Sequence, residues 1–226
     1  KKILAFGDCD FSGEKNINTM REKLIALPAT GEEVKALNVI YSPNANIFSG
    51  SNATESNFNN QSTKFGIIHL ATHSLVNEAL PLFSSIAFSK ENGEDGFLEA
   101  REIIKMEFNA QLVILSACKT AFGKQIAGEG MLGLTRAFFT AGIPSVVASL
   151  WQVEDNATKV LMVEFHKRLK EGKTPDLALK GAQIYMIKSL NINYLDGILF
   201  DLGISSYQVD SGYKGLSYKK DSPLNM

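Results

Sequence analysis

Hydrophobic residues in this chain gather in short apolar runs, and several of the segments between the runs have helical periodicity. The runs are continuous in Val, Ile and Leu rather than alternating with polar residues, which is typical of parallel strands buried on both faces. Strands are therefore predicted at residues 3–6, 66–73, 111–118 and 144–150, with a weaker one at 46–48.

Amphipathic patterns predict helices at residues 28–37, 99–108, 130–141, 156–170 and 175–190, and a short helix opening at 52–55. Thr30 and Glu33 have the spacing of a capping box, which predicts Thr30 as an N-cap. Residues 85–88 and 96–98 flank a turn rich in Gly, Asn and Asp, as in a hairpin. Strands that alternate with helices predict an α/β fold with a mainly parallel central sheet flanked by helices.

Composition narrows the classes of function. The 23 basic and 24 acidic residues give a net charge of −1, which argues against nucleic acid or a membrane surface as a partner. The two cysteines, Cys9 and Cys118, make no disulfide framework, so a reducing, cytoplasmic location is expected. The chain begins within an apparent strand, so we expect it to be part of a longer protein.

The candidate chemistry lies at the ends of two predicted strands. His73 and Cys118 each close an apolar run, and ligands of an open α/β sheet bind at the carboxyl ends of its strands. An imidazole and a thiol at one edge are the minimum for a cysteine hydrolase. His73 precedes Cys118 by 45 residues, close to the spacing in caspases, although the caspase cysteine signature is absent.

Other histidines and cysteines are weaker candidates, and each candidate also has a purely structural interpretation. A histidine at a strand end is often only a hydrogen-bonded buried residue, and His69, which lies four residues earlier inside the run, is the better example. His166 neighbours Lys167 and Arg168 on an amphipathic helix and is predicted to be solvated. Cys118 alone would usually be a small buried hydrophobe. Cys9 lies between two aspartates, which disfavour its thiolate.

Four segments together resemble the successive motifs of the CHAT domain, a caspase-like peptidase domain related to separase, caspases and gingipains. They are His69–His73, Leu115–Thr120, Gly128–Leu134 and Ser149–Thr158. The resemblance covers about residues 1–190 and implies a caspase–hemoglobinase fold with cysteine endopeptidase chemistry. By position it implies His73 as general base and Cys118 as nucleophile, with backbone N–H groups of Cys118 and Ser74 as oxyanion donors. It implies no cofactor and no metal.

The same resemblance places Trp151 and Asp155 beside the pockets for the substrate's P1 and P2 side chains. Asp155 could receive a basic P1 side chain, or it could be the N-cap of the helix at Asn156. Asp8 is a further substrate-binding candidate, with Asp10, because both follow the first strand. The expected partners are a protein or peptide substrate and a regulatory or repeat-domain protein.

The end of the chain departs from this family. Residues 194–226, with Asp196–Gly203 as their core, resemble an internal fragment of RsmH-type rRNA cytosine methyltransferases. The Gly-rich cofactor region of those enzymes has no counterpart here, so S-adenosylmethionine chemistry is not expected. We predict a CHAT domain at 1–190 and a foreign-looking segment at 191–226 that is not an independent domain. Within it, Gly197–Leu202 could serve as an edge strand, and Tyr207–Met226 is predicted to pack poorly.

Three functions follow as hypotheses. The first is a cysteine endopeptidase, the C-terminal catalytic part of a larger regulated protein. The second is an inactive CHAT-like scaffold for protein interactions. The third is a methyltransferase fragment without activity, based only on the last segment.

Overall fold

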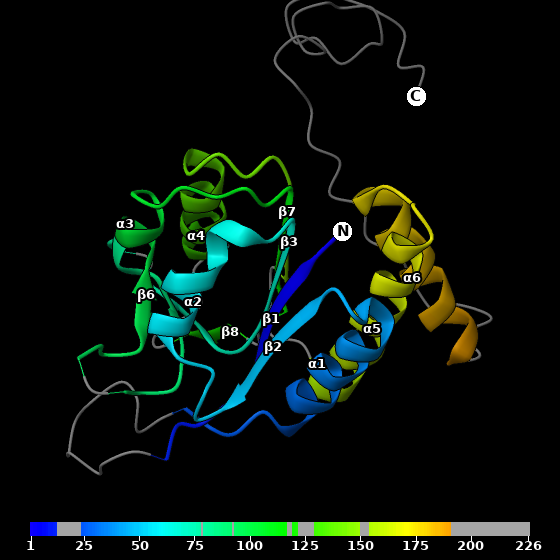
Figure 1. Cartoon of the computed structure of the whole chain (residues 1–226), viewed down its shortest axis with the longest axis horizontal. Helices are drawn as coiled ribbons and strands as arrows, with labels where there is room; N and C mark the ends of the chain where they lie inside the picture. The colour runs from blue at the N-terminus through cyan, green and yellow to red at the C-terminus, as the bar shows by residue number, and fades with distance from the viewer. Residues whose placement is uncertain are drawn as a thin grey trace, which may run out of the picture. The chain divides into compact units, whose positions relative to one another are not determined.

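A five-stranded parallel sheet forms the centre of the fold (Figure 1). The computed structural model describes residues 1–12, 24–77, 79–91, 93–116, 119–121, 129–149 and 154–190, with backbone alone at 119–121 and 129–132. In spatial order the strands are β2 (Ala45–Gly50), β1 (Ile3–Cys9), β3 (Ile67–Ala71), β7 (Leu112–Leu115) and β9 (Val146–Ala148). These strands and their parallel pairing confirm the predicted fold class.

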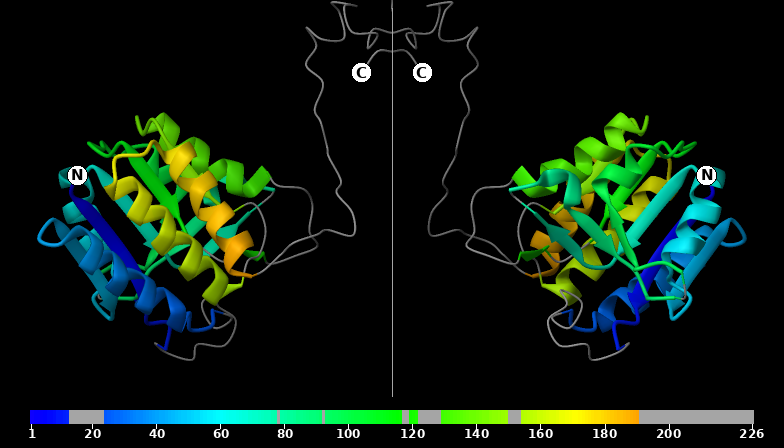
Figure 2. Two further views of the ribbon diagram at one scale, coloured as in Figure 1. Left: turned by 90° about the vertical axis from the view of Figure 1, so that its right-hand side faces the viewer. Right: turned by 90° about the vertical axis from the view of Figure 1, so that its left-hand side faces the viewer.

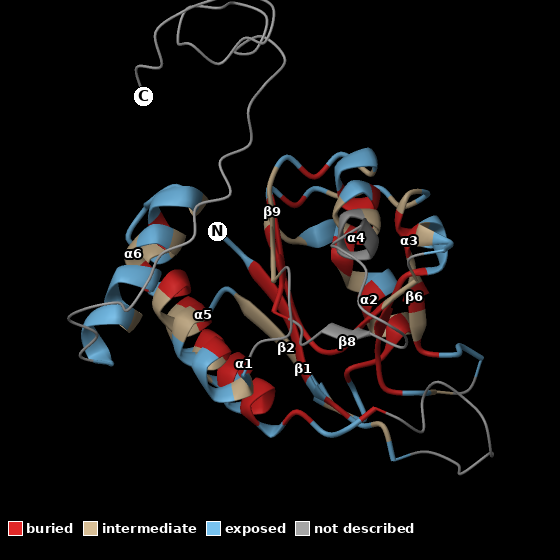
Figure 3. Cartoon of the chain, turned by 180° about the vertical axis from the view of Figure 1, so that it is seen from behind, coloured by how far each residue is buried: buried red, intermediate tan, exposed pale blue. Residues whose placement is uncertain are grey.

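Helices cover both faces of this sheet (Figures 1 and 3). One face packs against α1 (Pro28–Tyr41), α5 (Asp155–Lys170) and α6 (Pro175–Ser189). The other packs against α2 (Glu55–Gln61), α3 (Ala100–Ile103) and α4 (Glu129–Thr140). In β3, Ile67 and Ala71 join the first apolar cluster, whereas Ile68 and Leu70 join the second. Burial on both sides is why the strand sequences are continuously apolar.

A second, smaller sheet continues from the carboxyl ends of the central strands (Figure 2). Its order is β6 (Phe97–Glu99), β5 (Ser85–Ala87), β4 (Ser74–Val76) and β8 (Lys119–Ala121). The antiparallel pair of β5 and β6 is the predicted hairpin. Two short 3₁₀ helices, Ser62–Lys64 and Pro81–Phe83, lie in the connections. Only Thr72 and His73 separate β3 from β4, so His73 lies where the chain passes from one sheet to the other.

Two local predictions were wrong. The helix with Thr30 begins at Pro28, because proline suits the first helical position, and its N-cap Leu27 makes no side-chain cap. The Thr30 hydroxyl instead donates to the Leu27 carbonyl and accepts from the Asp8 N–H, at 2.6 and 2.8 Å. The helix predicted at 99–108 is shorter. The N-cap of α3 is Glu99, which forms a capping box with Glu102, and the helix ends at Ile103.

Lys1–Leu190 forms one compact unit. Residues 191–226 lie outside the described residues. The predictions made for Gly197–Leu202 and Tyr207–Met226 therefore remain predictions.

The close approach of β1 to α1 gives a stability prediction. A Cβ atom on Gly7 would lie 2.8 Å from the Thr30 carbonyl oxygen, which belongs to the backbone and cannot move aside. We expect Gly7→Ala to lower the free energy of unfolding by about 1–3 kcal/mol, the usual cost of overpacking. The measurement is urea unfolding, with Gly66→Ala as control, because a Cβ there meets nothing nearer than 4.0 Å. Equal stability of the two variants would contradict this packing.

Candidate functional site

His73 is the best-defined candidate for catalysis. Its side chain is 2% exposed, and its Nε2 lies 2.7 Å from the carbonyl oxygen of Ile25. A carbonyl only accepts hydrogen bonds, so this contact assigns the proton to Nε2. In the neutral ring Nδ1 then carries the lone pair that can take up a proton. Nothing in the sequence could indicate Ile25, because its contribution comes from a main-chain atom.

The backbone around His73 is held in place from the second sheet. The His73 carbonyl accepts from the Ala87 N–H at 2.9 Å, and the Thr72 hydroxyl donates to the Ala87 carbonyl at 2.6 Å. The Phe11 ring packs against the imidazole with 5.3 Å between ring centres. Main-chain bonds, an aromatic contact and the Ile25 carbonyl together fix the orientation of the ring.

Cys118 and Trp151 lie outside the described residues, but the strands on both sides of position 118 are defined. Leu115 is the register partner of Leu70 in the central sheet, and Lys119 is the partner of Ser74 in the small sheet. Each pair is separated by 45 positions, the same spacing that separates His73 from Cys118. Ser74, the predicted oxyanion residue, is fully buried in β4. The role of its N–H remains a prediction.

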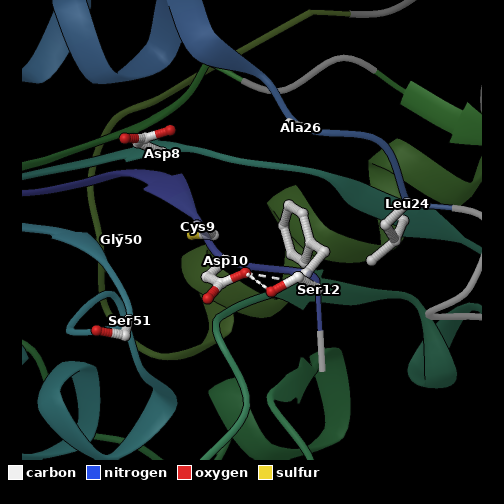
Figure 4. A pocket seen from close by; sticks show the side chains of 9 residues that line it. Asp8, Cys9, Asp10, Ser12, Leu24, Ala26, Gly50 and Ser51 are labelled. Carbon is white, nitrogen blue, oxygen red and sulfur yellow. Dashed lines mark hydrogen bonds between the residues drawn. The ribbon is translucent and has the colours of Figure 1, made fainter. Parts of the chain in front are cut away.

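A cavity of about 480 Å³ lies at the carboxyl ends of β1 and β2 (Figure 4). It is lined by Asp8, Cys9, Asp10, Phe11, Ser12, Leu24, Ala26, Gly50 and Ser51. His73 does not line it but packs against Phe11, which does. Two of the described lining residues carry carboxylates and none carries a positive charge. This arrangement suits a basic group.

The two aspartates are placed by the backbone of the strand end. Asp8 has a φ of 52° in the left-handed region, and its N–H donates to the Thr30 hydroxyl. The Asp10 N–H donates to Ser89 Oγ at 2.7 Å, while its carboxylate accepts from the N–H and hydroxyl of Ser12. The structure thus brings Asp8 to the cavity next to His73, on the strand end where it was expected.

Asp155 makes a contact that was not predicted. The N-cap of α5 is Glu154, whose carboxylate accepts from the N–H groups of Asn156 and Ala157, so the N-cap prediction for Asp155 was wrong. The Asp155 carboxylate instead accepts from the Ala29 N–H at 3.1 Å. Because Pro28 has no N–H, this is the first donor at the start of α1. Whether Asp155 also binds substrate remains a prediction.

A chain of buried polar groups lies under the sheet, away from the cavity. His69 Nε2 lies 2.6 Å from Glu33 Oε1, and His69 Nδ1 lies 3.1 Å from His166 Nε2. His166 Nδ1 in turn lies 3.0 Å from the Tyr41 hydroxyl. His69 is therefore the satisfied buried histidine that was predicted. Glu33 belongs to this chain rather than to a capping box.

The prediction that His166 is solvated was wrong. It is fully buried because it follows Met162 by four residues on the inner face of α5, whereas the charged residues after it point elsewhere on the helix. Burial, with the nearby His69, holds the pKa of His166 well below its usual range. Burial also raises the pKa of Tyr41 to about 12. A neutral imidazole and a neutral phenol are thus favoured, and Tyr41 can donate to His166.

An α/β fold with a parallel five-stranded central sheet flanked by helices is consistent with a caspase-like fold. The chain belongs to the CHAT domain family, whose profile it matches over residues 1–223. That family is related to caspase-like peptidases.

The chain also contains a short likeness to a different kind of protein. It is 51% identical over 41 residues to ribosomal RNA small subunit methyltransferase H of Clostridium botulinum, in strains including Hall, Okra and Loch Maree. The match covers 18% of this chain and 13% of the methyltransferase. The chain therefore spans about an eighth of the length of these curated relatives, which confirms the predicted partial match.

Two negative findings apply to the described part of the chain. No helix there has the length and apolar character that crossing a membrane requires. No group of three or more His, Cys, Asp or Glu side chains there is arranged to hold a metal ion.

The buried polar chain gives a second stability prediction. Tyr41→Phe removes one hydroxyl and leaves His166 Nδ1 without its partner, which costs about 1–3 kcal/mol for a buried group. The matched control is Tyr185→Phe, since the Tyr185 side chain is 42% exposed. Chemical denaturation measures both. A loss of the same size in the control would show that the hydroxyl of Tyr41 contributes nothing specific.

Proposed function

We propose that this domain is a cysteine endopeptidase in which His73 is the general base and Cys118 the nucleophile. The observation that carries the proposal is the geometry of His73, held at a strand end by the Ile25 carbonyl and presented beside a cavity. The register on either side of position 118 supports Cys118 as its partner, because the flanking residues already pair with the residues that flank His73.

The chemistry follows from these positions. His73 Nδ1 takes the proton of the Cys118 thiol, and the thiolate attacks the scissile carbonyl to form a tetrahedral intermediate. The intermediate collapses to a thioester, and the imidazolium gives its proton to the leaving amine. Water, deprotonated by His73, then hydrolyses the thioester. The Ile25 carbonyl stabilises the imidazolium, because it accepts from Nε2 throughout.

The intermediate also needs donors for its oxyanion. Membership of the family supports the backbone N–H groups of Cys118 and Ser74 in this role. One such donor contributes on the order of 3 kcal/mol in other enzymes.

For the substrate we propose a lysine or arginine side chain at P1. The cavity beside His73 has two carboxylates in its lining, from Asp8 and Asp10. Trp151 and Asp155 are the other proposed substrate-binding residues. A likeness that spans 13% of a methyltransferase supports no methyl transfer.

The dyad is tested with Cys118→Ala and His73→Ala against a library of peptides. Cys118→Ala removes the nucleophile and His73→Ala removes the general base, so we expect the rate of cleavage to fall at least about 10³-fold in each. Lys105→Ala, at an exposed site beyond α3, is the control. Cleavage that survives Cys118→Ala would contradict the proposal, and binding of a partner protein with no cleavage by the wild type would favour an inactive scaffold.

The P1 preference is tested with Asp8→Asn, because asparagine accepts the left-handed backbone of that position as aspartate does. We expect kcat/KM for substrates with basic P1 residues to fall about 10- to 100-fold, and that for neutral P1 residues to change little. Asp155→Asn is measured alongside. A loss confined to Asp155→Asn would assign the basic pocket to that residue and contradict the cavity.

A further inference from the structure

Glu55 is a buried carboxyl group with an incomplete set of hydrogen bonds. It follows the N-cap residue Thr54 at the start of α2 and is 3% exposed. Its Oε2 has no hydrogen-bond partner among the described residues, although the Gly96 N–H donates to the carboxylate. A buried carboxylate in this state is costly, so the protonated form is favoured.

Three acidic residues of the described part of the chain act on Glu55. Glu94 and Asp95 face it from the loop before β6, and Glu102 faces it from α3. Arg101 of α3 pairs with Glu99, while Lys90 and the acidic Glu91 lie at the start of the loop. Burial and these three like charges raise the pKa of Glu55 to about 7. Glu55 thus titrates near neutral pH.

The loop that faces Glu55 is joined to the cavity beside His73 through one serine. The Ser89 N–H donates to the Ala53 carbonyl at 2.8 Å, two residues before Glu55. The Ser89 hydroxyl donates to the Gly50 carbonyl and accepts from the Asp10 N–H, both at 2.7 Å. Gly50 and Asp10 both line the cavity. The two ends of the loop are joined by the hydrogen bond from the Phe88 N–H to the Gly96 carbonyl.

We propose that Glu55 is a proton-operated switch that controls the wall of the cavity through Ser89. Protonated Glu55 lets the described residues of the loop, 88–91 and 93–96, pack on the start of α2, which keeps Ser89 bonded to Asp10 and Gly50. Ionised Glu55 repels Glu94, Asp95 and Glu102, and the loop with Ser89 moves away. The effect on cleavage rests on the proposed peptidase function, whereas the effect on the fold does not.

The direction of the pH effect follows from the raised pKa. Below about pH 4.5 the carboxyl is protonated in both the folded and the unfolded chain, and its stabilising effect is complete. Between 4.5 and 7 the unfolded chain loses the proton first, so stability falls as pH rises, and above about 7 the loss is complete.

Thermal unfolding of the whole chain from pH 5 to pH 8 tests the switch without reference to activity. We expect Glu55→Gln to melt about 5 °C or more above the wild type at pH 8 and close to it at pH 5. Glu107→Gln, which changes an exposed carboxylate after α3, is the matched control and should follow the wild type at each pH. A constant difference between Glu55→Gln and the wild type across this range would overturn the proposal.

Two further readouts locate the effect. Amide exchange, corrected for its intrinsic pH dependence, should show the Asp10 N–H losing protection above pH 7 in the wild type and keeping it in Glu55→Gln. Protection that is equal in the two proteins would overturn the link through Ser89. In a separate measurement at pH 8, calcium chloride is added to both proteins. If it raises the melting temperature of the wild type to that of Glu55→Gln, Glu55 belongs to a cation site and the switch is overturned.

Peptide cleavage supplies the last readout. The kcat/KM of the wild type should fall above pH 7 relative to that of Glu55→Gln by about fivefold or more, chiefly through KM. If neither protein cleaves at any pH while the melting difference persists, the peptidase proposal has failed and the switch has not. If both cleave with the same pH profile, the coupling to the cavity is wrong.

Discussion

Burial of β3 on both faces is the constraint on which the rest of the structure depends. Its residues pair with β1 on one side and β7 on the other, and its side chains contribute alternately to two apolar clusters. Strand β3 is thus contacted on four sides, and its carboxyl end lies at the edge of the sheet where the ends of β1 and β7 also lie. His73 is therefore presented at the edge of the sheet by the packing of residues that have no chemical role.

The polar groups around this strand serve two different purposes. Under the sheet, His69 is bonded on both sides by Glu33 and His166, which joins β3 to α1 and α5. At the sheet edge, the His73 Nε2 donates to a main-chain carbonyl group, that of Ile25. The same residue type thus has two side-chain partners at position 69 and a main-chain partner at position 73.

The features that could be predicted from the sequence are those with a local pattern. Continuous apolar runs indicated the strands, and a turn composition indicated the hairpin of β5 and β6. Features that depend on distant partners were missed. Asp155 contacts Ala29, 126 positions away, and His166 contacts His69, 97 positions away. Ile25 contributes a main-chain oxygen, for which side-chain patterns carry no information.

The unchanged register across the two sheets has a consequence for how this region can vary. Leu70 pairs with Leu115 before the junction and Ser74 with Lys119 after it, so both chains cross with the same number of residues. A substitution at the crossing changes one side chain. A single inserted or deleted residue in either chain would shift one ladder against the other, so related sequences should differ here in composition but keep the same length.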